Sequence, residues 1–253
     1  MRHGGPDEAP AVLLVHGWGS AARTFDALAA RLDERYRVIT PDLRGHGASP
    51  AGPHPHRWTV SAMVDDLAVL ARSVRRPLVA VGHSLGGQMV STLAAHNNDL
   101  VAGLAVLDPA YGAGPDEVAA VRTRAAAIRA GGSAAAFAQV ESGFSAVMPQ
   151  ETRDRVRADM LAASPDVLLA LLETTYTGPG EEGSLGAVRS LAPRRSAPLL
   201  ALYSTPRAAA IERALPHGGP AEVREAPRPG HYVHLENPEW AAETLLGWLA
   251  GIL

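Results

Sequence analysis

Short apolar runs alternate with segments of helical spacing along the first part of the chain, and this alternation restricts the fold more than any other feature. The apolar runs lie at 11–15, 36–40, 78–81 and 101–107. In the segments between them, apolar residues recur every three or four positions. Such alternation is typical of a parallel sheet that is covered by helices on both faces. The sequence therefore predicts an α/β fold with a mostly parallel, doubly wound sheet.

The alternation is interrupted over residues 112–190, where the pattern indicates helices and no strand. An apolar run returns at 199–203, and a further short strand is expected at 222–225. We therefore expect a sheet of about six strands, with a helical lid inserted between two of them. The expected division is a first part of the core at 1–111, the lid at 112–190 and a second part of the core at 191–253. Because ligands of open α/β sheets bind beyond the carboxyl ends of the strands, the lid is expected to roof a site there.

Composition excludes several kinds of chemistry. The chain contains no cysteine, and all 23 basic residues are arginine. Thiol nucleophiles, cysteine-ligated metals, Schiff bases and the P-loop lysine are therefore excluded. A formal net charge of −3 gives no electrostatic reason to expect nucleic acid or an anionic membrane as a partner. We expect a cytoplasmic monomer or homodimer that acts on a small-molecule substrate and uses neither a cofactor nor a metal.

The strongest local signal is the sequence GHSLGG at residues 82–87. It follows a predicted strand directly and precedes a segment of helical spacing. This is the context in which a G-x-S-x-G turn holds a nucleophilic serine clear of the sheet. We therefore expect Ser84 to be a nucleophile, with the amide of Leu85 facing the reacting carbonyl group. The alternative is a serine that only caps a helix after a glycine turn.

Two further segments complete the candidate site. The sequence HGWG at 16–19 follows the first apolar run, and the amide of Trp18 is the expected second donor of an oxyanion hole. Near the end of the chain, His231 follows a glycine between the last predicted strand and the last predicted helix. A histidine there is suited to accept the proton of a serine nucleophile. His234 is expected instead to pack at the start of the last helix.

These segments occur in the order typical of lid-bearing α/β-hydrolases of the hydrolase-1 type, and the chain resembles that family over essentially its whole length. The matching stretches are 16–19, 40–49, 82–87 and 230–238. The resemblance implies that Ser84 is the nucleophile and His231 is the base. It also implies that the amides of Trp18 and Leu85 are the oxyanion donors.

The chain departs from the family pattern in two places. The acid of the triad normally follows the strand after the lid, but here no carboxylate follows residues 199–203 until Glu212. Asp108, at the end of the strand before the lid, is the best substitute, and certain lactone hydrolases and cofactor-free dioxygenases of the fold carry the acid there. The lid carboxylates Glu141 and Glu173 remain alternatives. In addition, only ten residues precede the first apolar run, so one or both initial antiparallel strands of the family are expected to be absent.

The leading functional hypothesis is a serine hydrolase that cleaves an ester or lactone of a mainly apolar small molecule through an acyl-enzyme on Ser84. A cofactor-free dioxygenase that uses His231 and Asp108 as its base is the first alternative. A non-catalytic receptor on the same fold is the second. Serine at the turn argues against dehalogenase and epoxide hydrolase activity, which use aspartate there. The side chains predicted to line the substrate site are Trp18, Phe137, Phe144, Val147, Met148, Leu172 and Tyr176, with packing inside the lid as the alternative.

Overall fold

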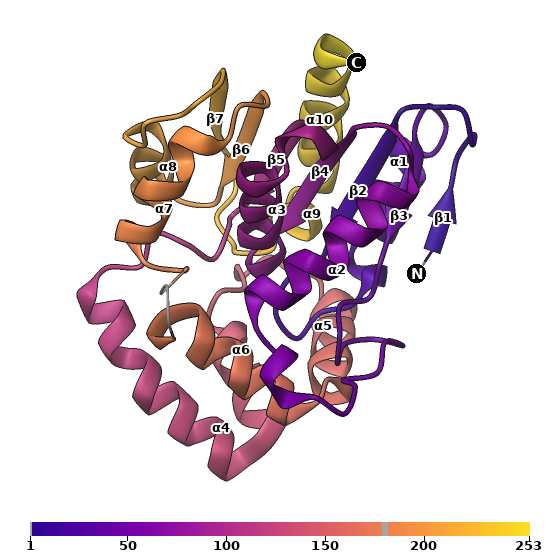
Figure 1. Cartoon of the computed structure of the whole chain (residues 1–253). Coiled ribbons are helices and arrows are strands. Elements are labelled where there is room, and N and C mark those ends of the chain that lie inside the picture. The colour runs from indigo at the N-terminus through magenta and orange to yellow at the C-terminus, as the bar shows by residue number, and fades with distance from the viewer. Residues whose placement is uncertain (1, 179–181) are drawn as a thin grey trace.

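A computed structural model describes residues 2–178 and 182–253, so three residues of the predicted lid, 179–181, lie outside the described part of the chain. Seven strands form one sheet in the order β1-β3-β2-β4-β5-β6-β7 (Figure 1). The first strand pairs antiparallel with β3, and every other pair is parallel. The predicted fold class is therefore confirmed. The strands are β1 (Arg2–Gly4), β2 (Ala11–Val15), β3 (Arg37–Thr40), β4 (Leu78–His83), β5 (Val101–Leu107), β6 (Leu199–Tyr203) and β7 (Ala221–Glu225).

The strand that the sequence did not predict is β1, which makes the count seven instead of about six. It has three residues, and they pair with Thr40, Ile39 and Val38 of β3. An edge strand this short is held by backbone hydrogen bonds and carries no apolar run, so hydrophobic periodicity cannot detect it. One initial antiparallel strand of the family pattern is therefore present in a short form.

Alternate residues of the central strands face two different cores. In β2, Leu13 packs with helices α2 (Val60–Ser73) and α3 (Leu85–His96) on one face. Its neighbour Leu14 packs with helices α1 (Asp26–Leu32) and α10 (Pro238–Ile252) on the other face. A strand covered on both sides reads as a continuous apolar run, which is why these strands were visible in the sequence.

The order of the strands places a crevice at one point of the carboxyl edge. From β2 the chain moves outward to β3, and then it returns across β2 to form β4 on the other side. The loops that follow β2 and β4 therefore separate in opposite directions. Ligands of doubly wound sheets bind at such a switch point.

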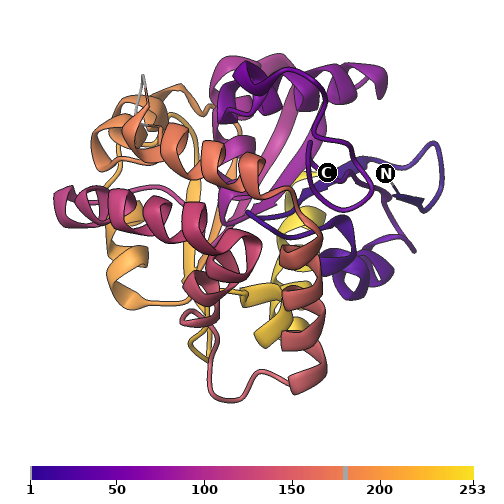
Figure 2. The same ribbon diagram turned by 90° about the horizontal axis from the view of Figure 1, so that it is seen from below.

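The helices inserted between β5 and β6 lie beyond this carboxyl edge (Figures 1 and 2). The longest of them bends sharply at Gly132, whose φ of +58° lies in the left-handed region that favours glycine. No helix in the described residues is long and apolar enough to cross a membrane. The inserted helices are α4 (Pro115–Glu141), α5 (Gln150–Ala162), α6 (Pro165–Thr177) and α7 (Leu185–Leu191).

Two short helices complete the second part of the core. Helix α8 (Pro206–Arg213) follows β6, and α9 (Val233–Glu236) lies between β7 and α10. The loop before α9 carries His231. This loop therefore approaches the same carboxyl edge as the loops after β2 and β4.

Candidate active site

Ser84 occupies a sharp turn between β4 and α3. Its φ of +52° and ψ of −118° are strained for a residue with a side chain, and such strain is typical of functional turns. Its N–H donates to the carbonyl oxygen of Leu107 at 3.0 Å, which holds the turn against β5. A Cβ atom added at Gly86 would collide with the carbonyl oxygen of Val15. The glycine therefore allows α3 to start directly against β2.

The structure brings Ser84, His231 and Asp108 together. The hydroxyl of Ser84 lies 2.9 Å from Nε2 of His231, and Nδ1 of His231 lies 2.7 Å from Oδ2 of Asp108. A carboxylate only accepts hydrogen bonds, so Nδ1 carries a proton and Nε2 of the neutral ring is free to accept one. The three side chains are thus aligned for transfer of a proton from the serine to the histidine.

Two backbone contacts fix the position of His231. Its N–H donates to the carbonyl oxygen of Gly143 in the loop after α4, at 2.9 Å. Its carbonyl oxygen accepts a hydrogen bond from Nε2 of His83, also at 2.9 Å. Burial lowers the pKa of His83 well below its ordinary value, so that ring is neutral. Sequence reasoning assigned no role to His83, although its place beside Ser84 in the turn was a usable signal.

Asp108 is held by the residue that follows β6. The N–H of Ser204 donates to Oδ1 of Asp108 at 3.0 Å, and the hydroxyl of Ser204 donates to Oδ2 at 2.9 Å. Asp108 itself has a φ of +45°, and its N–H donates to the carbonyl oxygen of Leu202. Ser204 stands where the family pattern places the acid, so here that position supports the carboxylate instead of supplying it.

Two residues that lie beside Ser84 in the lining of one cavity, Trp18 and Leu85, have backbone amides without a partner in the described part of the chain. Within the part of the chain that the structure describes, no acceptor takes a hydrogen bond from the N–H of Trp18 or Leu85. Leu85 begins α3, so its amide belongs to the first turn of the helix, where N–H groups have no helical acceptor. The Trp18 side chain is anchored separately, since its Nε1 donates to the carbonyl oxygen of Leu168 at 2.9 Å.

A cavity of about 550 Å³ opens above Ser84 and His231, between the sheet edge and the inserted helices. Trp18, Leu172 and Tyr176 line it, as predicted from the sequence. Polar side chains of the inserted helices also line it, namely Glu117, Arg124, Gln139, Ser142 and Thr175. A larger hollow of about 690 Å³ lies between α3 and α7, and its lining contains none of the predicted site residues.

Four of the predicted lining residues lie elsewhere. Phe137 packs inside the inserted helices, while Phe144 and Met148 pack around Tyr232. Val147 is 62% exposed. The expectation of a mostly apolar wall is therefore corrected. Hydrophobicity in a helical segment does not distinguish side chains that pack between helices from those that face a ligand.

The family model described as "Alpha/beta hydrolase family" matches residues 12–244. The chain belongs to this family. Lipase LipV of Mycobacterium tuberculosis is 44% identical to the chain over 108 residues, which are 42% of this chain and 40% of that protein. A pimeloyl-[acyl-carrier protein] methyl ester esterase of Chromobacterium violaceum is 39% identical over 100 residues, 40% of this chain and 37% of that protein. The matches thus span about two fifths of these curated relatives.

Solved structures extend the similarity of this α/β-hydrolase to the whole chain. A thermophilic esterase from Thermogutta terrifontis has a TM-score of 0.82 and 27% identity, with 99% of this chain and 92% of that chain covered. An enol-lactonase from Burkholderia xenovorans has a TM-score of 0.80, with 98% and 95% covered, but only 20% identity. The second likeness shows a shared fold alone.

The other candidate acids of this α/β-hydrolase have different partners. Glu173 pairs with Arg129 on the surface, and Glu141 is exposed. Glu212 is completely buried and forms an ion pair with Arg195, whose Nη2 lies 3.0 Å from Oε1 of Glu212. Of the carboxylates considered, the structure places only that of Asp108 against His231.

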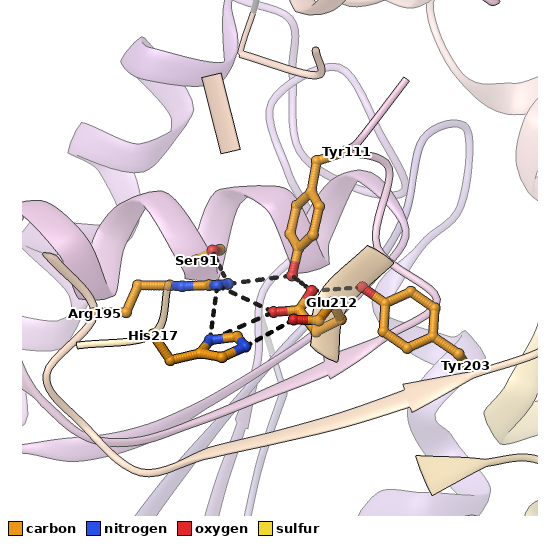
Figure 3. A network of polar contacts seen from close by, with 6 residues as sticks. All are labelled: Ser91, Tyr111, Arg195, Tyr203, Glu212 and His217. Carbon is orange, nitrogen blue, oxygen red and sulfur yellow. Dashed lines mark hydrogen bonds and ion pairs between the residues drawn. The ribbon is translucent and has the colours of Figure 1, made fainter. Parts of the chain in front are cut away.

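Glu212 is the centre of a buried polar network (Figure 3). Its Oε2 accepts hydrogen bonds from the hydroxyl groups of Tyr111 at 2.8 Å and Tyr203 at 2.6 Å. Burial raises the pKa of both tyrosines, so both hydroxyls remain donors. Tyr111 lies three residues after Asp108, and Tyr203 immediately precedes Ser204. The network therefore fixes the two loops that carry Asp108 and Ser204.

His234 lies away from the proton-transfer line, as the sequence predicted. Its ring stacks on Phe25 with 4.6 Å between ring centroids. Burial lowers the pKa of His234 to about 3, so the ring is neutral. His16 is also buried, with a pKa lowered to about 3, and its Nε2 accepts a hydrogen bond from the N–H of Leu43. This contact joins the loop after β2 to the loop after β3.

Proposed function

We propose that the protein is a serine hydrolase that cleaves a carboxylic ester or lactone through an acyl-enzyme on Ser84. The observation that carries this proposal is the alignment of Ser84, His231 and Asp108, with distances of 2.9 Å and 2.7 Å between successive partners. The lipase and esterase names of the relatives support the same reaction class. The residues 112–190 act as the lid in this proposal, because α4 and α6 supply much of the cavity wall.

In the first half of the reaction, the oxygen of Ser84 attacks the substrate carbonyl carbon while Nε2 of His231 takes the serine proton. Asp108 holds the ring in the correct tautomer and stabilises the imidazolium that forms. The tetrahedral intermediate collapses when the C–O bond to the leaving alcohol breaks, and His231 returns the proton to that oxygen. In the second half, a water molecule activated by His231 hydrolyses the acyl-enzyme.

The oxyanion of each tetrahedral intermediate is bound by the amides of Trp18 and Leu85. Each such donor contributes about 10²–10³ in kcat when it is fixed in place before the reaction. The glycines around Ser84 allow both loops to approach closely, and the hydrogen bond from Trp18 to α6 keeps its loop from moving away. The amides thus act without reorganisation during the chemical step.

Incubation with a fluorophosphonate followed by intact-mass spectrometry tests the proposal. We expect one covalent adduct on the unmodified protein and none on Ser84→Ala. The unmodified protein should also hydrolyse 4-nitrophenyl acetate under nitrogen as fast as in air. Absence of both the adduct and the turnover would refute the serine mechanism, and oxygen-dependent turnover that survives Ser84→Ala would favour the dioxygenase alternative.

A further inference from the structure

The cavity above Ser84 contains an arginine that forms no ion pair with any carboxylate in the described part of the chain. Arg124 of α4 is partly buried and lines the cavity together with Ser84 and His231. Its Nε donates to Oε1 of Gln139 at 3.0 Å. Neither terminal amino group of its guanidinium donates to a group among residues 2–178 and 182–253, and no carboxylate of these residues forms an ion pair with it.

The bend of α4 at Gly132 holds this arginine in place. Because the helix turns back on itself, Gln139 from the second half faces Arg124 from the first half. The Nε2 of Gln139 donates to the backbone carbonyl oxygen of Arg124 at 3.1 Å, while its Oε1 accepts from the side chain. This reciprocal pair fixes the guanidinium plane and leaves its two terminal amino groups able to donate to a ligand. A fixed pair of N–H groups is suited to bind a carboxylate through two parallel hydrogen bonds.

A second polar group in the same wall also lacks a partner. Thr175 of α6 is 1% exposed and lines the cavity, and its hydroxyl has no hydrogen-bond partner among the described residues. A buried hydroxyl without a partner costs free energy that a bound ligand can recover. Glu117 is the acidic residue in the lining, but its Oε2 is engaged by the N–H of Gly114 at 2.7 Å.

We infer that the cavity selects an ester or lactone that carries a carboxylate away from the scissile bond, with Arg124 as its binding residue. The inference rests on the proposed serine hydrolase function, since Ser84 has to act on the other end of the same substrate. Gln139 is a positioning residue for Arg124, and Thr175 supplies a further hydrogen bond to the polar end. The earlier expectation of a mainly apolar substrate is replaced by one with an apolar middle and an anionic end.

A pair of esters that differ in one terminal group tests this inference. The neutral probe is 4-nitrophenyl hexanoate, and the anionic probe is mono-4-nitrophenyl adipate, in which a carboxylate replaces the terminal methyl group. For the unmodified protein we expect a higher kcat/KM with the adipate ester. Arg124→Met should lower kcat/KM for the adipate ester by about 10- to 100-fold, because a charge-assisted bidentate contact is lost. It should change the value for the hexanoate ester less than threefold.

Arg122→Met is the matched control, because Arg122 is an exposed arginine of the same helix outside the cavity. It should leave both values unchanged. Gln139→Ala should lower the preference for the adipate ester less than Arg124→Met does, since the charge remains. An unchanged ratio of the two esters in Arg124→Met would overturn the inference while leaving the serine hydrolase function intact.

Binding of adipate to Ser84→Ala, measured by titration calorimetry, separates the two proposals. We expect binding that the double variant Ser84→Ala/Arg124→Met loses. If the unmodified protein cleaves neither ester and takes no fluorophosphonate, the proposed function fails, and Arg124-dependent binding of adipate would still support an anion site. Absence of adipate binding to Ser84→Ala would overturn the inference itself.

Discussion

The hydroxyl group of Ser204 donates to Oδ2 of Asp108 at 2.9 Å, the same oxygen that faces Nδ1 of His231. The two residues follow neighbouring parallel strands, β6 and β5. One strand end therefore supplies the carboxylate and the next supplies two hydrogen bonds that orient it. In the proposed mechanism the acid therefore lies one strand away from the place where the family pattern has it.

Replacement of Asp108 by asparagine should leave the fold intact and lower kcat by about 10³–10⁴, because asparagine favours the wrong tautomer of His231. The rate is measured with a 4-nitrophenyl ester, and the fold by circular dichroism. Addition of Ser204→Asp to this variant should recover part of the lost rate, since it places a carboxylate after β6, where the family pattern has the acid. A variant Asp108→Asn within tenfold of the parent would show that Asp108 is not the acid.

Removal of the Ser204 hydroxyl should have a smaller effect of a different kind. Ser204→Ala takes one of the hydrogen bonds from Oδ2 of Asp108, while the backbone N–H still donates to Oδ1. A hydrogen bond to a charged group is worth about 1.5–3 kcal/mol, so we expect kcat to fall by about 10- to 150-fold. KM should not change, because Ser204 does not line the cavity. A change confined to KM would contradict this role.

Substitution of the two histidines near the last helix should have different effects, one on the reaction rate and the other on stability. His231→Ala removes the base, and kcat should fall by several orders of magnitude while the melting temperature changes little. His234→Ala leaves a cavity against Phe25, so it should lower the free energy of unfolding by about 1–3 kcal/mol and leave kcat near the parent value. The opposite assignment of the two effects would show that His234 is the base.

The stability should fall in acid because buried histidines stay neutral in the folded state. The pKa of His234 is lowered from 6.5 to about 3, and that of His16 is lowered equally. The free energy of unfolding that depends on these neutral rings is complete above pH 6.5. It is lost as the pH falls from 6.5 towards 3, because the unfolded chain then binds protons that the folded chain does not. Each such histidine lowers the free energy of unfolding by up to about 1.4 kcal/mol for each unit by which the pH falls in this range.

Urea unfolding at pH 7.5, 6.5, 5.5 and 4.5 measures this dependence. In His234→Asn, the number of protons taken up on unfolding between pH 6 and 4, read from the slope of the free energy of unfolding against pH, should fall by close to one. His54→Asn, at an exposed loop position, should not change this slope. An unaltered slope in His234→Asn would mean that its ring is protonated in the folded protein.

The buried ion pair of Arg195 and Glu212 should be much more sensitive to loss of one partner than to loss of both. Glu212→Gln leaves the Arg195 charge buried without compensation, and the free energy of unfolding should fall by about 3–5 kcal/mol. The double variant Arg195→Met/Glu212→Met removes both charges, so it should be more stable than Glu212→Gln. If the free energy of unfolding fell equally in the two variants, the hydrogen bonds from the tyrosine hydroxyls to Glu212 would matter more for stability than its charge.

The sequence predicted every strand except β1, as well as Ser84 and His231, because each of these has a local signature. Buried strands appear as apolar runs, and Ser84 is marked by the glycines of a tight turn. Asp108 was found by elimination, since no carboxylate follows β6 until Glu212. The supporting contacts were not accessible in this way. The partner of Ser204 lies 96 positions away in the chain, and no periodicity or motif encodes such a pairing. For His83, its place beside Ser84 was a signal, but its contact with the carbonyl oxygen of His231 could not be read from the sequence.

The cavity wall was the least predictable part of the site. The bend at Gly132 decides which side chains of α4 face Ser84, and it brings Gln139 against Arg124. The sequence predicted helices over this segment, but the direction that the chain takes after a bend depends on tertiary packing. Apolar residues such as Phe137 were therefore assigned to the wall, while the polar residues that line it were passed over.

The inserted helices begin after Tyr111 and end before Arg195, and these two side chains touch, with Nη1 of Arg195 lying 3.2 Å from the hydroxyl oxygen of Tyr111. The two ends of the inserted segment are thus joined to each other next to the sheet, by this contact and by the hydrogen bond from the N–H of Ala113 to the carbonyl oxygen of Gly183. The entropy of closing a loop between fixed ends grows slowly, by about 0.6 kcal/mol for each doubling of its length. The inserted segment also supports the site, because the carbonyl oxygens of Gly143 and Leu168 accept hydrogen bonds from the N–H of His231 and from Nε1 of Trp18. A segment of another length could close the same gap at this small cost, but it would keep the alignment of Ser84 and His231 only if it supplied these two acceptors.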